Sequence, residues 1–157
     1  YTGILPLCKN EAGLAAVIGH EMAHAVARHG AQRMTQQLVL NLGLSVASVS
    51  FQNSKYRDLI IASLGAGSTV GILLPYSRDN EYEADEIGTI YMARAGYDPN
   101  EAVNLWKRFA SMGGSQQPEF LSTHPYSQNR AQRLSSLMPR AMAEYKKSPK
   151  YGLGSNL

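Results

Sequence analysis

Two histidines four positions apart, in the stretch AVIGHEMAHAVARHG at residues 16–30, constrain the fold of this chain more than any other feature. On an α-helix, residues four apart are separated by about 40° beyond one full turn, so His20 and His24 project from one face about 6 Å apart. Apolar residues recur at helical spacing from Leu14 to Val26, which predicts a helix here. Two imidazoles on one helix face can share one ion, so the fold has to bring further ligands to this helix.

Glu21 lies beside the two histidines on the same predicted helix. It points about 60° away from the mean direction of the pair, so its carboxylate can reach a water on the ion without binding the ion itself. The spacing His-Glu-x-x-His is typical of zinc hydrolases, in which zinc activates a water and polarises the scissile carbonyl while the glutamate moves the proton. The alternative interpretation is that His20 and His24 are incidental residues of an ordinary helix. A third ligand is needed to choose between the two.

His29 is the nearest candidate for a third ligand, but its spacing does not fit. Where the third ligand follows on the same segment, a glycine comes three residues after the second histidine and the ligand six after it, and these positions hold Ala27 and Gly30. His29 also lies half a turn round the helix from His20. We predict that it is a surface or capping histidine.

Glu81 and Asp85, in the segment SRDNEYEAD, are better candidates. They are also four apart and share a helix face. Glu81 on the metal would bring Asp85 to the far nitrogen of a ligand histidine, which fixes the tautomer of that ring. Glu83 and Glu86 lie about 200° and 140° round from Glu81, so we expect them to form a solvated acidic face. The alternative, that all four are such a face, loses weight beside the first motif.

Capping and helix-breaking residues divide the chain into a mostly helical pattern with one domain over residues 1–157. The expected helices cover residues 10–30, 34–51, 59–74, 77–96, 98–109 and 127–137, with stops at Gly30, Pro75, Gly96 and Pro139. Asn10, Ser77 and Asp98 are the expected N-caps. We expect a loop over residues 113–123, and a small β edge over residues 1–5 is the one strand candidate.

Composition excludes several classes of protein. The 17% charged residues and net charge of +3 are ordinary, and Lys and Arg are scattered, so no nucleic-acid partner is indicated. Cys8 is the only cysteine, which excludes an internal disulfide, and we expect it to be an unreactive core residue. Residues 59–74 carry no charge but would span only about 24 Å as a helix, short of a hydrocarbon core of about 30 Å. We therefore expect a buried helix of a soluble domain, and the alternative is a helix that dips into a membrane.

Three segments together resemble metallopeptidase family 48 of the gluzincins, which includes the HtpX-type and CAAX prenyl protease-type enzymes. They are LAAVIGHEMAHAVARHG, then YSRDNEYEADEIG followed by ARAGYDP, then FLSTHPYSQNRAQRL. The resemblance implies a zincin-like metallopeptidase domain with one Zn²⁺ on His20, His24 and Glu81. It implies Glu21 as general base and Asp85 as the residue behind the ligand histidine.

The resemblance also marks His124 and Arg130 as neighbours of the active site. His124 could donate to the oxyanion of the tetrahedral intermediate, or take the open zinc position and hold the enzyme inactive, or cap the following helix. Arg130 could pair with Asp85 or another carboxylate of the site, or only with its own helix face. The sequence leaves these alternatives open.

Within the family the chain is most similar to soluble bacterial envelope proteases that act in protein quality control. This similarity implies an unfolded or misfolded polypeptide substrate and a location in the bacterial envelope. Because the chain begins at Tyr1 without a methionine, we expect a missing upstream segment that includes part of the substrate-binding edge and could give peripheral membrane association. The leading hypothesis is a zinc endopeptidase. The rivals are a zinc-bearing chaperone or binding module that is silent or latched by His124, and a helical interaction domain without metal.

Overall fold

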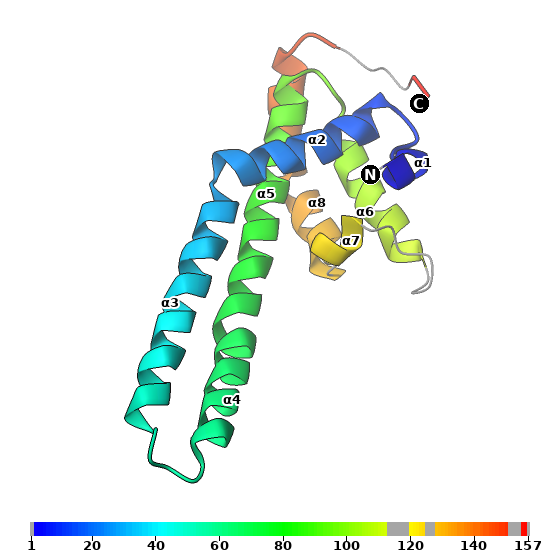
Figure 1. Cartoon of the computed structure of the whole chain (residues 1–157). Helices are drawn as coiled ribbons and strands as arrows, with labels where there is room; N and C mark the ends of the chain where they lie inside the picture. The colour runs from blue at the N-terminus through cyan, green and yellow to red at the C-terminus, as the bar shows by residue number, and fades with distance from the viewer. Residues whose placement is uncertain (1, 113–119, 125–127, 151–154, 157) are drawn as a thin grey trace. The chain divides into compact units, whose positions relative to one another are not determined.

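The computed structural model describes residues 2–112, 120–124, 128–150 and 155–156, and these residues form helices and no strand (Figure 1). The elements are η1 (Thr2–Ile4), α1 (Leu5–Cys8), α2 (Glu11–Val26), α3 (His29–Ser50), α4 (Arg57–Ser68), η2 (Thr69–Leu73), α5 (Leu74–Arg94), α6 (Asn100–Ser111), α7 (Phe120–Thr123) and α8 (Gln128–Lys147). The prediction of a mostly helical chain is confirmed. The expected β edge is wrong, because the described residues there form η1 and the start of α1, where the second residue, Pro6, is tolerated as in any first helical turn.

The chain divides into two compact units. The first, which we call the site unit, comprises residues 1–24 and 81–157; the second, the hairpin unit, comprises residues 25–80. The long helix α5 begins in the hairpin unit and continues into the site unit. In sequence, the hairpin unit is therefore an insertion between His24 and Glu81.

Helix α2 begins where its sequence predicts and ends earlier. Asn10 caps it, since the Gly13 N–H donates to Asn10 Oδ1 over 2.8 Å. The predicted stop at Gly30 is wrong, because the break falls at Arg28, whose φ of 59° lies in the left-handed region. Gly30 instead belongs to the first turn of α3.

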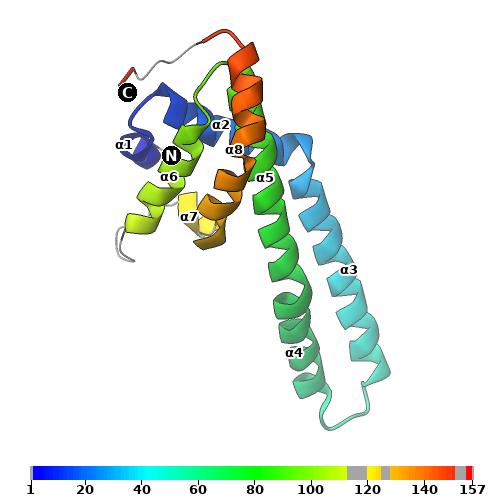
Figure 2. The same ribbon diagram turned by 180° about the vertical axis from the view of Figure 1, so that it is seen from behind.

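The hairpin predicted for the hairpin unit is confirmed, since α3 and α4 lie side by side in both views (Figures 1 and 2). Its predicted end at Pro75 is wrong: the helix runs on from α4 through η2 into α5, with Ser77 inside it. η2 is a single π-helical turn, and it directly precedes Pro75. A proline removes one backbone hydrogen bond, and the wider π turn lets a helix adjust to that loss without ending.

The prediction that residues 59–74 form a buried helix is half right. The segment is helical, but the described structure buries none of the residues of α4 or η2. Among the described residues, one helix, Arg57–Arg94, is long and apolar enough to cross a membrane, and no part of its most apolar stretch is buried. Composition identified the apolar run but not what covers it.

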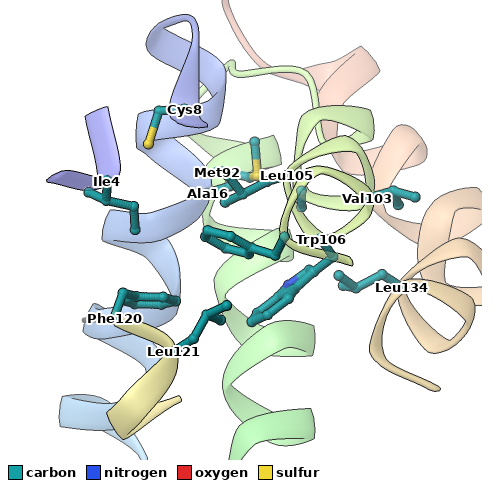
Figure 3. Close-up of a cluster of buried hydrophobic side chains, with 12 residues drawn as sticks. Ile4, Cys8, Ala16, Met92, Val103, Leu105, Trp106, Phe120, Leu121 and Leu134 are labelled. Carbon is teal, nitrogen blue, oxygen red and sulfur yellow. The ribbon is translucent and has the colours of Figure 1, made fainter. Parts of the chain in front are cut away.

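The core of the site unit is built from side chains of η1, α1, α2, α5, α6, α7 and α8, with Trp106 among them (Figure 3). Helix α6 begins after Asp98, whose Oδ1 accepts the Asn100 N–H over 2.9 Å, as the sequence predicts. Its apolar face is buried: Val103, Leu105, Trp106 and Phe109 are each at most 6% exposed. This face of α6 packs under the two helices that carry the motif residues.

The ends of α5 and α8 test two more predicted stops. Gly96, with a φ of 88°, ends α5 as predicted. Helix α8, in contrast, continues through Pro139 to Lys147. Beyond Pro139 it buries Ala141 against Ile90 and Ala93 of α5, and this burial compensates for the hydrogen bond that proline removes.

The predicted loop over residues 113–123 is described only at its end. Residues 113–119 lie outside the described part of the chain, and Phe120–Thr123 form the short helix α7. Cys8 is fully buried, and burial raises the pKa of its thiol, in agreement with the expected unreactive core residue.

Candidate metal centre

Two glycines let α2 and α5 touch within the site unit. A Cβ on Gly88 would lie 2.6 Å from the backbone nitrogen of His20, closer than any side chain tolerates. The backbones therefore meet next to the residues that carry the motif. His20 and His24 on α2 and Glu81 and Asp85 on α5 consequently face one another.

Three side chains converge on one point. The Nε2 atoms of His20 and His24 are 3.0 Å apart, and each lies 3.4 Å from a different oxygen of Glu81. Ligands about 2.0–2.1 Å from a tetrahedral zinc ion lie roughly 3.3 Å from one another, so the three donors have the separations that such an ion needs. The donor set of two imidazoles and a carboxylate is also one that zinc prefers. The residues present therefore fit a zinc ion.

His124 completes the group. Its ring nitrogen lies with the donor atoms of His20, His24 and Glu81 in a set whose members are all within 4.8 Å of one another. His124 Nε2 is also 3.4 Å from Glu21 Oε1, and the Glu21 side chain is half exposed. Glu21 is thus beside the group and accessible to solvent without belonging to it.

Asp85 and Arg130 support the ligands from behind. Asp85 Oδ1 is 3.0 Å from His20 Nδ1, although the ring N–H is not aligned well enough on the carboxylate to form a regular hydrogen bond. Arg130 donates to both oxygens of Asp85 over 2.7 Å and to Glu81 Oε2 over 2.9 Å. Arg130 therefore pairs with both carboxylates of the site and not only with its own helix face, which were the two alternatives that the sequence left open. Its guanidinium, 1% exposed, neutralises charge that would otherwise be buried unpaired.

Burial and charge act in opposite directions on the pKa values of these groups. Burial raises the pKa of Glu81 and of Asp85, but contacts with the histidines and the positive charge of Arg130 outweigh it and hold both values below the ordinary range. Burial lowers the pKa of His20, and its contacts with Asp85 and Glu81 raise it further than burial lowers it. The two carboxylates are thus ionised at neutral pH, the form in which a carboxylate binds metal.

Burial lowers the pKa of His124 and is the largest effect on it; the charges of Glu81 and Glu21 raise the pKa, His20 and His24 lower it, and the net shift is downward. His124 is consequently neutral at pH 7. A neutral imidazole has the free lone pair that binding to a metal requires.

The sequence indicated no role in the centre for two aromatic residues, although Phe120 begins the segment FLSTHPYSQNRAQRL. The Trp106 ring lies 3.6 Å from the Arg130 guanidinium carbon, and the Phe120 ring stacks on His124 with centroids 4.5 Å apart. The sequence placed Trp106 only in the core, and Phe120 in the loop. Neither the helical periodicity around Trp106 nor the position of Phe120 in the chain indicates which residue each ring stacks on.

The remaining candidates lie outside the group. His29 is not a member of it, as predicted, but at 3% exposed it is buried, so the expected surface position is wrong. Glu83 and Glu86 are exposed, in agreement with the predicted acidic face, and Glu86 Oε1 accepts a hydrogen bond from Arg140 over 2.7 Å.

Comparison with known proteins identifies the class to which this fold and centre belong. The sequence profile described as Peptidase family M48 matches residues 1–138. The chain therefore belongs to peptidase family M48, a family of metallopeptidases, as the sequence resemblance implied. No solved structure matches the chain.

Similar curated proteins come from mitochondria and from bacteria. "Mitochondrial metalloendopeptidase OMA1" of Schizosaccharomyces pombe is 37% identical over 96% of this chain and 44% of its own length. The protein of the same name from Saccharomyces cerevisiae is 35% identical over 99% of this chain and 45% of its own length. The "Beta-barrel assembly-enhancing protease" of Yersinia pestis is 32% identical over 83% of this chain and 28% of its own length. The chain thus spans less than half the length of these relatives.

Proposed function

We propose that the chain is a zinc-dependent endopeptidase that hydrolyses peptide bonds, with one Zn²⁺ held by His20, His24 and Glu81. The observation that carries the proposal is the convergence of these three side chains at separations of 3.0–3.4 Å. Membership of a metallopeptidase family and similarity to proteins named metalloendopeptidases support it. Residues 1–157 act as one peptidase domain, into which the hairpin unit is inserted.

Each side chain of the centre has a separate task in this proposal. When bound, zinc would lower the pKa of a water and polarise the scissile carbonyl. Glu21, half exposed beside the group, accepts the proton of the attacking water and gives it to the leaving amine. Asp85 holds the His20 ring from its far nitrogen, and Arg130 holds Asp85 and Glu81.

The substrate that we propose is an unfolded or misfolded polypeptide, which makes the chain part of protein quality control. The Glu21 side chain is half exposed, so a polypeptide segment in an extended conformation can bring a peptide bond to it. The relatives named as mitochondrial support a mitochondrial location over the bacterial envelope that the sequence resemblance implied, which fits only the bacterial relatives.

The test compares hydrolysis of an unfolded protein by the zinc-loaded chain with that by Glu21→Gln at the same zinc content. We expect cleavage by the wild type, loss of at least 100-fold in Glu21→Gln, and no change in the control Glu86→Gln, whose carboxylate is exposed, pairs with Arg140 and is not among the donors of the group. Glu81→Gln should lose most of its zinc. Full zinc retention in Glu81→Gln would disprove the ligand assignment, and equal turnover in Glu21→Gln would disprove the role of the base.

A second candidate function rests on His124. Because its ring nitrogen lies within the donor group, it can take the position that a catalytic zinc leaves open for water. The chain would then be a latched enzyme, or a zinc-bearing chaperone or binding module that is silent in this conformation. Zinc-loaded wild type that binds an unfolded protein without cutting it, and gains activity in His124→Ala, would favour this candidate.

A further inference from the structure

The hairpin unit exposes an unusual amount of apolar surface. Its exposed large apolar residues, tyrosines apart, are Val26, Met34, Leu38, Val39, Leu42, Val46, Val49, Phe51, Leu59, Leu64, Val70, Ile72 and Leu74, each between 41% and 75% exposed. Most of them lie along the two arms of the hairpin, α3 and α4 with η2 (Figure 1). Soluble monomers rarely expose one continuous apolar area of this extent, so it indicates a partner.

The charges of the hairpin are confined to its two ends. Residues 34–54 and 59–77 contain no Asp, Glu, Lys, Arg or His, and each uncharged segment runs along one arm. Between them, at the tip, are Lys55, Arg57 and Asp58, and at the base are Arg28, Arg33, Arg78 and Asp79. A partner protein that binds through ion pairs would find no charged side chain to pair with along the arms. A hydrocarbon phase needs none.

The length of the second arm also fits a bilayer, and this arm belongs to Arg57–Arg94, the one helix among the described residues that is long and apolar enough to cross a membrane. As a helix, residues 59–77 extend about 28 Å, close to the thickness of a hydrocarbon core of about 30 Å. Tyr56 stands at one end of this segment and Tyr76 at the other, and aromatic residues of this kind are enriched where a membrane meets water. Positive residues lie just beyond both.

Several polar side chains on the arms form hydrogen bonds within the hairpin. Ser45 Oγ donates to the Asn41 carbonyl over 2.8 Å and Thr69 Oγ1 to the Gly65 carbonyl over 2.9 Å. Gln37 Nε2 donates to Asn41 Oδ1 over 3.3 Å. These bonds reduce the free-energy cost of transfer from water to hydrocarbon, where an unsatisfied polar group costs several kcal/mol.

We propose that the hairpin unit inserts into the hydrocarbon interior of a lipid bilayer. The end of the hairpin that carries Arg28, Arg33 and Arg78 would lie at the membrane surface. The sequence instead favoured a buried helix over a membrane-dipping one for residues 59–74, and it indicated peripheral membrane association through a segment before Tyr1. The inference does not depend on the peptidase function, since it concerns residues 25–80 alone. A second copy of the chain that covers the same apolar arms is the alternative, and the experiment separates the two.

The experiment measures flotation of the full chain with vesicles of phosphatidylcholine and phosphatidylglycerol. We expect the wild type to float, and Ile72→Arg to lower its vesicle–water partition coefficient by at least about 100-fold, because an arginine side chain in the middle of a membrane helix is strongly disfavoured. The matched control is Ile18→Arg in the site unit, since Ile18 is 50% exposed and Ile72 is 53% exposed. Equal loss in both variants, or a wild type that stays in solution as a dimer, would overturn the proposal.

A second measurement keeps the proposal testable if Ile72→Arg fails to fold. An environment-sensitive fluorophore is attached to Val70→Cys, and the same label on Lys107→Cys, exposed on α6, serves as control; the native Cys8 is buried and stays unlabelled. We expect the emission of the label at position 70 to shift to the blue when vesicles are added, with no shift at position 107. No shift at position 70, or equal shifts at both positions, would contradict insertion.

Discussion

Gly19 and Gly88 bring the two halves of the metal centre together by direct contact of their backbones. A Cβ on Gly19 would lie 2.6 Å from the Gly88 carbonyl oxygen, and one on Gly88 would lie 2.7 Å from the Gly19 carbonyl carbon. Gly19 directly precedes His20, and Gly88 follows Asp85 by less than one turn of α5. The separation between the histidines and the carboxylates is therefore set by two residues that have no side chain.

Gly88→Ala should therefore weaken the metal centre as well as the fold. The methyl group has to push the two backbones apart, which costs about 1–3 kcal/mol of unfolding free energy and separates the ligands. We expect zinc affinity, measured by competition with a chromogenic chelator, to fall at least about 10-fold. The control is Gly43→Ala on α3, where an added Cβ has no neighbour within 4 Å and should be neutral or stabilise the helix by up to about 1 kcal/mol. Wild-type zinc affinity in Gly88→Ala would show that the contact does not position the ligands.

The residues of the proposed metal centre could be predicted because the members of each pair are about one helical turn apart. The geometry of a helix alone brings His20 toward His24 and Glu81 toward Asp85. Gly19, Gly88 and Trp106 could not be predicted in this way, since their partners are distant in sequence and depend on how the helices pack. From the sequence alone, a single glycine in a helix indicates only a small loss of helix propensity and not a close contact with another helix.

Local stop signals were less reliable than periodicity. Pro75 and Pro139 both lie within helices, because a π turn precedes the first and buried contacts follow the second. The exposure of residues 59–74 could not be predicted from composition, since the same apolar run fits a protein core or a membrane. The physical environment of a helix is a tertiary property.

Arg130→Met should destabilise the metal-free chain strongly. It removes the guanidinium that pairs with Asp85 and Glu81 and leaves two buried carboxylates without their cation. Breaking a buried pair in this way costs about 3–5 kcal/mol, measured as the free energy of unfolding in urea. Arg133→Met is the matched control, because Arg133 is exposed and lies over the Tyr82 ring, a contact worth about 1 kcal/mol or less. Equal losses of unfolding free energy in the two variants would show that the buried ion pairs of Arg130 do not stabilise the fold more than the exposed contact of Arg133.

Asp85→Asn should reduce zinc affinity while Glu86→Gln does not. Asp85 lies 3.0 Å from His20 Nδ1, so its charge orients the ring and raises the basicity of Nε2. Loss of such a partner typically lowers metal affinity by about 10–100-fold. Isothermal titration of zinc into both variants measures the effect. A wild-type affinity in Asp85→Asn would assign that carboxylate to the support of Arg130 alone.

Acid should unfold the metal-free chain more readily than its ordinary surface charges would. The folded pKa of Asp85 lies below the ordinary value of 3.8, so the ionised carboxylate stabilises the fold above that pH, and this contribution is lost as the pH falls through the folded value. The folded pKa of Glu81 also lies below its ordinary value, which is 4.5, so the ionised Glu81 stabilises the fold in the same way and this contribution is also lost in acid. Thermal unfolding with excess chelator should show a steeper loss of stability below pH 4.5 in the wild type than in Asp85→Asn. Parallel curves would contradict this linkage.

His124→Ala distinguishes two of the three roles that the sequence left open for this residue, a latch on the zinc position and a donor to the oxyanion. The neutral ring stacks on Phe120 and places its nitrogen within the donor group, so we expect it to occupy a position on the ion in the resting chain. Its removal should speed zinc dissociation about tenfold and raise peptidase activity at saturating zinc, because the position becomes open to water. Stopped-flow release of zinc to a chelator, beside single-turnover cleavage, measures both quantities. If zinc release is unchanged and cleavage falls by about 100-fold or more, His124 stabilises the oxyanion instead, since that is the loss typical of removing one such donor.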